Sequence, residues 1–174
     1  MDSNVTGLFI AGSETTATLL AGVTYLLCSN PDVLEKLNRE VRSTFKSEGE
    51  IDLMAVGKLP YLPACLEEAM RMYPPAPDVM PREVPRGGTT ITNIFVPENV
   101  SLPGRLHGPR SPPLTRLQTV VRVYHYAINH MEKYFVDPHG YHPERFLKQK
   151  PFENDRLDAL QPFNVGKRDC IGRT

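Results

Sequence analysis

The chain lacks an excess of charge of either sign, because its 20 Lys and Arg residues balance its 20 Asp and Glu residues. Its basic residues are also scattered rather than gathered into runs. A protein that binds nucleic acid or an anionic lipid surface through electrostatics needs a basic patch or stripe. The composition therefore disfavours nucleic acid as a partner and leaves an ordinary folded domain as the expectation.

Cysteine is scarce as well, and the three present are Cys28, Cys65 and Cys170. Their number is odd, their spacing is wide, and none forms the C-x-x-C pair expected of a zinc site or a disulfide framework. A reducing compartment suits such a chain. Cys28 and Cys65 lie among apolar helix positions, where a free cysteine is expected to be a small buried hydrophobe.

A long uninterrupted apolar run is also missing. The most apolar stretch, residues 8–27, is interrupted by Ser13, Glu14, Thr15, Thr16 and Thr18. Such a segment spans a bilayer poorly and predicts a buried helix instead. Residues 1–7 lack the basic and then apolar layout of a signal peptide, so no targeting element is expected.

Three helices are predicted from apolar periodicity and from helix-breaking residues. They cover residues 5–28, 31–45 and 59–75, and the third ends where Pro74 and Pro75 interrupt its pattern. Asn30 is expected to cap the second helix, with Pro31 at its first position. The second helix is amphipathic, whereas the third repeats Leu62, Leu66, Ala69 and Tyr73 along one face.

Short strands are expected between the third helix and the C-terminal region. Residues 82–97 favour a hairpin, since β-branched residues follow Gly87 and Gly88, and residues 119–126 favour a further strand. Residues 100–118 fit neither pattern, because they are rich in proline and arginine without periodicity. So long a structureless segment is unusual inside a compact domain and predicts an insert.

The strongest motif is Phe163-x-x-Gly166-x-Arg168-x-Cys170-x-Gly172. An isolated cysteine in a glycine-rich turn is usually an inert thiol, but these fixed positions together resemble the haem-binding loop of the cytochrome P450 family. The resemblance implies haem b as cofactor, with the Cys170 thiolate as axial ligand that favours O–O cleavage. It also implies that Phe163 shields the sulfur, that Arg168 neutralises a haem propionate, and that Gly166 and Gly172 allow close approach of the backbone.

Residues 11–16, AGSETT, resemble the oxygen-side helix of the same family. The resemblance implies catalytic roles for Glu14 and Thr15, which relay protons, while Gly12 leaves room for the ligand beside the haem. Alone, the string is weak evidence, because Glu and Thr on a helix are more often a solvated face or bond back to a carbonyl.

Glu68 and Arg71 are three residues apart on the third helix and can pair. Together with Arg145 of the Pro-Glu-Arg-Phe motif at 143–146, they resemble the structural triad of the family, which holds the fold and the haem pocket. Arg82 resembles a second propionate contact, although a surface arginine is an equally good interpretation.

The resemblance as a whole implies a mostly α fold with a small β-sheet (α+β), in which residues 1–174 form the C-terminal part of a cytochrome P450 domain. It implies a monooxygenase that inserts one atom of dioxygen into a small, lipophilic organic substrate, with an NADPH-dependent reductase as electron donor. The full-length parent is expected at the cytosolic face of the endoplasmic reticulum membrane, with its anchor, much of its substrate pocket and a helix after Gly172 lying outside this sequence.

Two alternatives remain open. The chain is an inactive truncated or mis-spliced product without stable haem binding, or it is a haem-thiolate isomerase or dehydratase, against which Glu14 and Thr15 argue. Residues 100–118 are interpreted as a retained intron. Val-Ser can be encoded by GTNAGT and Gln by CAG, and joining Asn99 to Thr119 restores a turn that leads into a strand.

Overall fold

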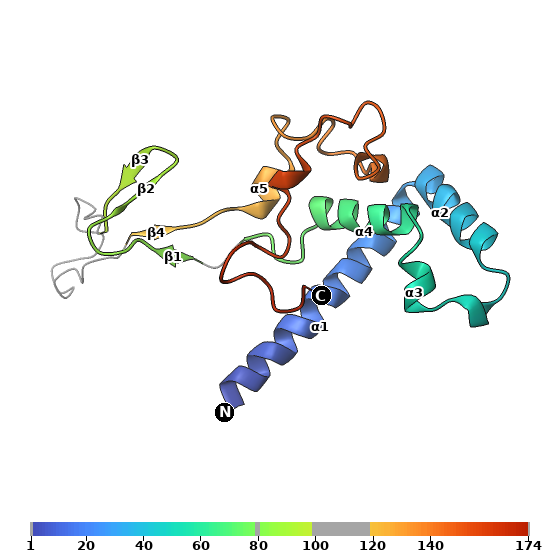
Figure 1. Ribbon diagram of the computed structural model, residues 1–174, viewed down its shortest axis with the longest axis horizontal. Helices are drawn as coiled ribbons and strands as arrows, with labels where there is room; N and C mark the ends of the chain where they lie inside the picture. The colour runs from blue at the N-terminus through green and yellow to red at the C-terminus, as the bar shows by residue number, and fades with distance from the viewer. Residues whose placement is uncertain (1, 79–80, 99–118, 174) are drawn as a thin grey trace, which may run out of the picture. The chain divides into compact units, whose positions relative to one another are not determined.

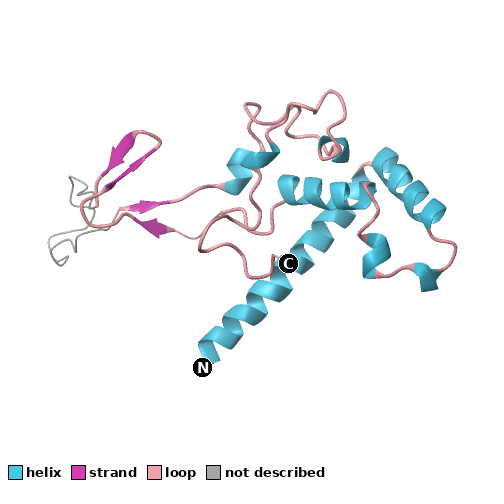
Figure 2. Cartoon of the chain, viewed as in Figure 1, coloured by secondary structure: helices cyan, strands magenta, loops and turns pink. Residues whose placement is uncertain are grey.

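The computed structural model describes residues 2–78, 81–98 and 119–173, with side chains from residue 4 onward. These residues form two compact units, residues 1–77 with 124–174 and residues 78–123. The first unit is helical and the second holds all four strands of the described residues (Figures 1 and 2). The expected α+β class is therefore confirmed. The predicted insert at 100–118 lies outside the described residues.

The first unit is built around three helices, α1 (Asp2–Ser29), α2 (Pro31–Thr44) and α4 (Tyr61–Met72). Shorter helical turns are η1 (Glu48–Glu50), α3 (Leu53–Val56), α5 (His125–Asn129), η2 (Pro143–Arg145) and η3 (Leu157–Ala159). Helix α4 contacts α1, α2, α5 and η2, so it is the central element of this unit (Figure 1). Its core comprises Val23, Leu26, Val33, Leu37, Tyr61, Cys65, Ala69 and Tyr141.

Helix α4 begins and ends where its sequence and its neighbours dictate. The Glu40 carboxylate of α2 accepts hydrogen bonds from the backbone N–H groups of Tyr61 (2.8 Å) and Leu62 (3.0 Å), which have no partner within the helix. Its C-terminus precedes Pro74 and Pro75, which cannot continue a helix. The predicted end of the helix is therefore confirmed, and its start is set by a residue of another helix.

Several local predictions are wrong in detail. Only the C-terminal half of α1 packs against the core, so residues 4–17 are exposed rather than buried, and Cys28 is exposed too. The Asn30 side chain does not cap α2, because it donates to the Leu26 carbonyl at the end of α1 instead (2.8 Å). Tyr73 is exposed because the buried face of α4 follows Tyr61, Ala64, Cys65 and Glu68.

The second unit contains two small antiparallel sheets. Strands β2 (Thr89–Ile91) and β3 (Ile94–Val96) form the expected hairpin, whose two-residue turn has positive φ at Thr92 and Asn93, as in a type I′ turn. Strand β1 (Arg82–Glu83) pairs with β4 (Val120–Val121). The strand expected over residues 119–126 is shorter than predicted, since His125 already begins α5.

Among the described residues, no helix combines the length and the apolar character that crossing a membrane requires. This agrees with the interruption of the apolar stretch at 8–27 by polar side chains.

Candidate haem-binding site

The cysteine motif folds into one closed loop. The backbone N–H of Cys170 donates to the Phe163 carbonyl (2.8 Å), and that of Asp169 donates to the Gly166 carbonyl (3.2 Å). Gly166 has φ +84°, a left-handed conformation that residues with a Cβ atom rarely adopt. The motif predicted that Gly166 allows either close approach of the backbone or a sharp turn, and this left-handed conformation fits the sharp turn.

The thiol of Cys170 is exposed, as are Arg168 and Gly172, while Phe163 is half-buried. A Cβ atom added at Gly172 would lie 3.7 Å from Cys170 Sγ, which is ordinary van der Waals contact. The loop therefore brings Phe163, Gly166, Cys170 and Gly172 together. It presents one sulfur atom that is accessible to a ligand.

The residues predicted to act on the oxygen side lie on the exposed half of α1. The Thr15 hydroxyl donates to the Ala11 carbonyl (2.6 Å), and that of Thr16 donates to the Gly12 carbonyl (3.1 Å). Both are the usual bonds of threonine within a helix. A Cβ atom at Gly12 would meet nothing within 4 Å, and Glu14 is exposed. Glu14 and Thr15 are adjacent, but in this conformation the Thr15 hydroxyl is engaged by the backbone.

The predicted triad forms a buried ion cluster in the first unit. Arg71 holds Glu68 through two hydrogen bonds, from Nε to Oε2 (2.8 Å) and from Nη2 to Oε1 (2.9 Å). Arg145 Nε approaches the same carboxylate at 3.3 Å, and all three side chains are fully buried. Bidentate charge-assisted bonds of this kind are strong and geometrically specific. The structure thus brings together the residues that the sequence placed in the triad.

The cluster also fixes the backbone that crosses it. Arg71 Nη1 donates to the carbonyls of Asn129 and Pro138, each at 2.7 Å, and Nη2 donates to the Gly140 carbonyl at 3.0 Å. The backbone N–H of His142 donates to Glu68 Oε1 (3.0 Å). Helix α4 therefore holds the end of α5 and the chain that leads to Arg145.

Sequence reasoning missed several members of this cluster. Asp155 pairs with Arg145 Nη1, and the rings of Phe135 and Phe152 lie beneath the Arg145 guanidinium. Burial lowers the pKa of Arg145, while the Glu68 charge opposes that shift. Asp155 belongs to none of the motifs. The one feature of the sequence that could have indicated its role is its position ten residues after Arg145.

Arg82, the proposed second propionate contact, lies in β1 of the second unit, where its backbone pairs with Val121. It is exposed, and its Nη1 group donates to the carbonyl of Pro81 (3.3 Å).

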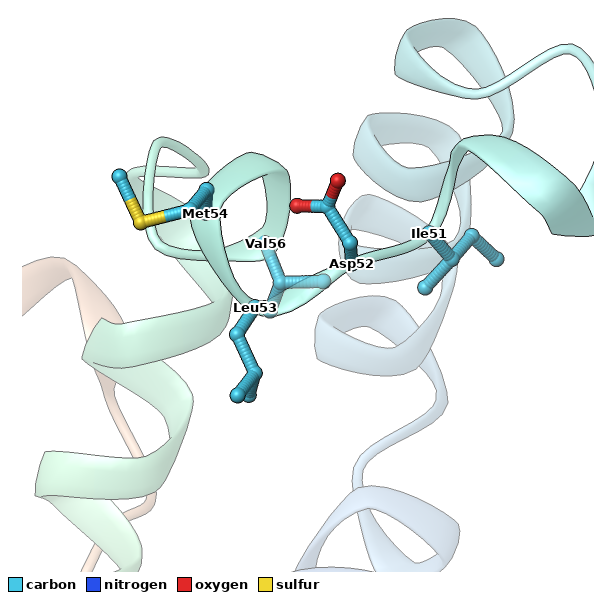
Figure 3. Close-up of a pocket in the computed structure, with 5 residues that line it drawn as sticks. All are labelled: Ile51, Asp52, Leu53, Met54 and Val56. Atoms are coloured by element: carbon cyan, nitrogen blue, oxygen red, sulfur yellow. The ribbon is translucent and has the colours of Figure 1, made fainter.

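A separate hollow lies at the short helix α3 (Figure 3). It is lined by Ile51, Asp52, Leu53, Met54 and Val56. Its one carboxylate, Asp52, accepts a hydrogen bond from the Ala55 N–H (2.8 Å) and so caps α3. The remaining lining is aliphatic. This hollow contains none of the predicted site residues.

The family model described as Cytochrome P450 matches residues 1–102 and 116–174. The chain therefore belongs to the cytochrome P450 family, as the cysteine motif predicted. The unmatched residues fall inside the predicted insert.

Fungal relatives cover almost the whole chain. The cytochrome P450 monooxygenase prhB of Penicillium brasilianum is 50% identical over 96% of this chain and 30% of its own length. Trichothecene C-15 hydroxylase of Fusarium sporotrichioides is 43% identical over 98% of this chain and 31% of its own length. The chain thus spans about 30% of the length of these relatives.

The fold is similar to that of solved members of the family. A zebrafish cytochrome P450 solved with progesterone matches with a TM-score of 0.72 at 28% identity, over 95% of this chain and 32% of that one. This match confirms that the helices and small sheets form part of the cytochrome P450 fold.

Proposed function

We propose that this chain carries the haem-binding cysteine loop and the oxygen-side helix of a cytochrome P450 monooxygenase, with the Cys170 thiolate bound to the iron of haem b. The observation that carries the proposal is the closed loop at 163–172, which presents an exposed Cys170 sulfur between Gly166 and Gly172. A single thiolate supplies one bond to a metal. It therefore suits an iron whose other ligands come from a porphyrin.

The residues of the loop have separate tasks in this proposal. When bound, haem supplies oxygen activation, which its thiolate ligand favours by donating electron density to the iron. With haem bound, Phe163 would help to keep water from the sulfur, and the positive charge of Arg168 would pair with a propionate. Gly172 lies beside Cys170 Sγ, where an added Cβ atom would be 3.7 Å from the sulfur.

The oxygen-side residues manage protons. The Thr15 hydroxyl donates to the Ala11 carbonyl in this structure; with haem and dioxygen bound, it would hold a proton at Oγ1, and the Glu14 carboxyl would resupply that proton. Gly12 would leave room for the ligand beside the haem; among the described residues, none lies within 4 Å of its missing Cβ position. The reaction inserts one oxygen atom into an organic substrate and reduces the other to water.

The partners follow from the reaction class. They are a small, lipophilic organic substrate, dioxygen and an NADPH-dependent reductase as electron donor. The full-length protein is proposed to act at the cytosolic face of the endoplasmic reticulum membrane.

The alternative is that the 174-residue chain by itself is an inactive truncated or mis-spliced product that does not bind haem stably. The exposure of its side chains supports this alternative. Large apolar side chains on α1 are open to solvent, with Leu8 62% and Phe9 74% exposed, and the Cys170 thiol is unprotected. Exposed apolar surface of this kind marks either an interaction site or a tendency to aggregate.

Haem titration with cysteine variants tests the first proposal. Cys170→Ser is compared with Cys28→Ser, since both thiols are exposed and only one lies in the loop. We expect the thiolate-type Soret band of the reduced, carbon monoxide-bound form to disappear in Cys170→Ser and to persist in Cys28→Ser. An unchanged band in Cys170→Ser would exclude Cys170 as the ligand, and no haem binding by the unsubstituted chain favours the alternative.

A further inference from the structure

The buried ion cluster contains a fourth charged side chain, Asp155, that the motifs do not include. Its side chain is 2% exposed, and its Oδ2 atom pairs with Arg145 Nη1. Its Oδ1 atom accepts a hydrogen bond from the backbone N–H of Val136 (2.9 Å). Both oxygens of the carboxylate therefore have partners inside the protein.

Without Asp155, the buried cluster would have a net positive charge. Glu68, Arg71 and Arg145 are all fully buried, and together they hold two positive charges and one negative charge. An uncompensated charge is strongly unfavourable away from water. The carboxylate of Asp155 brings the cluster to neutrality, and it contacts the arginine that has the weaker contact with Glu68.

Asp155 also begins the segment that leads to the cysteine loop. The next residue, Arg156, donates its backbone N–H to the Tyr134 carbonyl (2.9 Å), which fixes the direction of the chain. Further along, Gln161 Nε2 donates to the Asp158 carbonyl (2.9 Å), and the Asn164 N–H donates to the Gln161 carbonyl (3.0 Å). Successive local bonds therefore connect the anchored Asp155 with the residues that open the loop.

We infer that Asp155 is the fourth, charge-balancing member of the buried cluster and a positioning residue for the loop that carries Cys170. The positioning role rests on the proposed function of that loop. The charge-balancing role does not, because it concerns the stability of the chain in the absence of any cofactor.

Asp155→Asn tests the first role, because asparagine preserves the shape and one carboxyl-like acceptor while removing the charge. Asp158→Asn is the matched control: the same substitution three residues later, in a side chain that is 67% exposed and paired with Arg156. In thermal unfolding of the 174-residue chain, we expect the midpoint to fall by about 10 °C for Asp155→Asn. The control is expected to shift it by less than about 2 °C.

A second variant keeps the test decisive if Asp155→Asn does not fold. Arg145→Met combined with Asp155→Asn leaves only the neutral Glu68–Arg71 pair in the cluster. Charge balance predicts that this double variant unfolds at a higher temperature than either single variant. Additive losses, equal midpoints for Asp155→Asn and Asp158→Asn, or no cooperative transition in the unsubstituted chain would each overturn the inference.

The positioning role is read from the haem spectrum. We expect Asp155→Asn to lower the fraction of the reduced, carbon monoxide-bound form that has a thiolate-type Soret band, and Asp158→Asn to leave that fraction unchanged. An equal fraction in both variants overturns the positioning role. If the unsubstituted chain binds no haem, the two variants are compared in the chain extended from its gene to the length of its relatives. Absence of the band in that extended chain overturns the proposed function and this role with it, while the unfolding data decide the charge-balancing role separately.

Discussion

The backbone N–H of Thr119 donates a hydrogen bond to the carbonyl oxygen of Glu98 at 3.0 Å. Glu98 and Thr119, the described residues on either side of the predicted insert, therefore lie side by side within the second unit. The Val84 N–H donates to the Thr119 carbonyl (2.8 Å), so the residue after the insert is already part of the β1–β4 pairing.

Deleting residues 100–118 should therefore leave the fold intact. Joining Asn99 to Thr119 keeps the two ends in place and shortens the connection, which lowers the cost of closing it by up to about 2 kcal/mol. We expect an unfolding midpoint equal to or higher than that of the full chain. Transcript sequencing should find messages without these codons, whereas a deletion variant that fails to fold would show that the segment is part of the domain.

Glu68→Gln should destabilise the chain far more than a change at its neighbour. The substitution leaves Arg71 and Arg145 buried with the Asp155 carboxylate, which pairs with Arg145 alone. We therefore expect a loss of about 3–5 kcal/mol in the free energy of unfolding. Glu67→Gln, an exposed position on the same helix, should change it by less than about 0.5 kcal/mol. Urea unfolding measures both values. Similar losses for the two variants would show that the buried ion cluster does not contribute more to stability than an exposed position of α4.

Glu40→Gln should weaken the start of α4. The substitution removes the negative charge that Tyr61 and Leu62 N–H groups contact, at a helix end where negative charge is favourable. We expect a loss of about 1 kcal/mol. Glu35→Gln on the same helix, whose carboxylate pairs with Arg39 in solvent, should cost less than about 0.5 kcal/mol in the same urea experiment.

The three thiols should differ in reactivity. Cys65 is fully buried, and burial raises its pKa to about 12, whereas Cys28 and Cys170 are exposed. Because the pKa of Cys65 is raised in the folded state, its contribution to stability is complete below the ordinary thiol pKa. That contribution is lost as pH rises from about 9 toward about 12.

With a thiol reagent at about pH 8, we expect Cys28 and Cys170 to react at least ~100-fold faster than Cys65. Cys28→Ser should remove one fast thiol and leave the slow one unchanged. Three equal rates would contradict the packing of Cys65 beneath α1 and α2.

Local patterns predicted the helices, the hairpin and the cysteine loop because each depends on nearby residues. Pro31 and Pro74 mark helix boundaries wherever the chain is placed, and Gly166 has the positive φ that its turn requires. The third member of the triad, Arg145, could be placed only through the family motif.

Other features depend on contacts distant in sequence. The exposure of Cys28 depends on which face of α1 meets α2 and α4. The Asn30 side chain donates a hydrogen bond to the Leu26 carbonyl and does not cap the start of α2. The role of Asp155 follows only from its contact with Arg145 in the folded chain. These are tertiary effects that periodicity does not encode.

We propose that Cys170 binds haem iron within a cytochrome P450 monooxygenase because its sulfur is exposed on the closed loop at 163–172. The most direct test is the reduced, carbon monoxide-bound spectrum of two chains: the present one, and one that lacks residues 100–118 and is extended from its gene to the length of its relatives. We expect a thiolate-type Soret band in the extended chain, and its loss on Cys170→Ser. Soluble, folded protein with no such band in either chain would contradict the assignment.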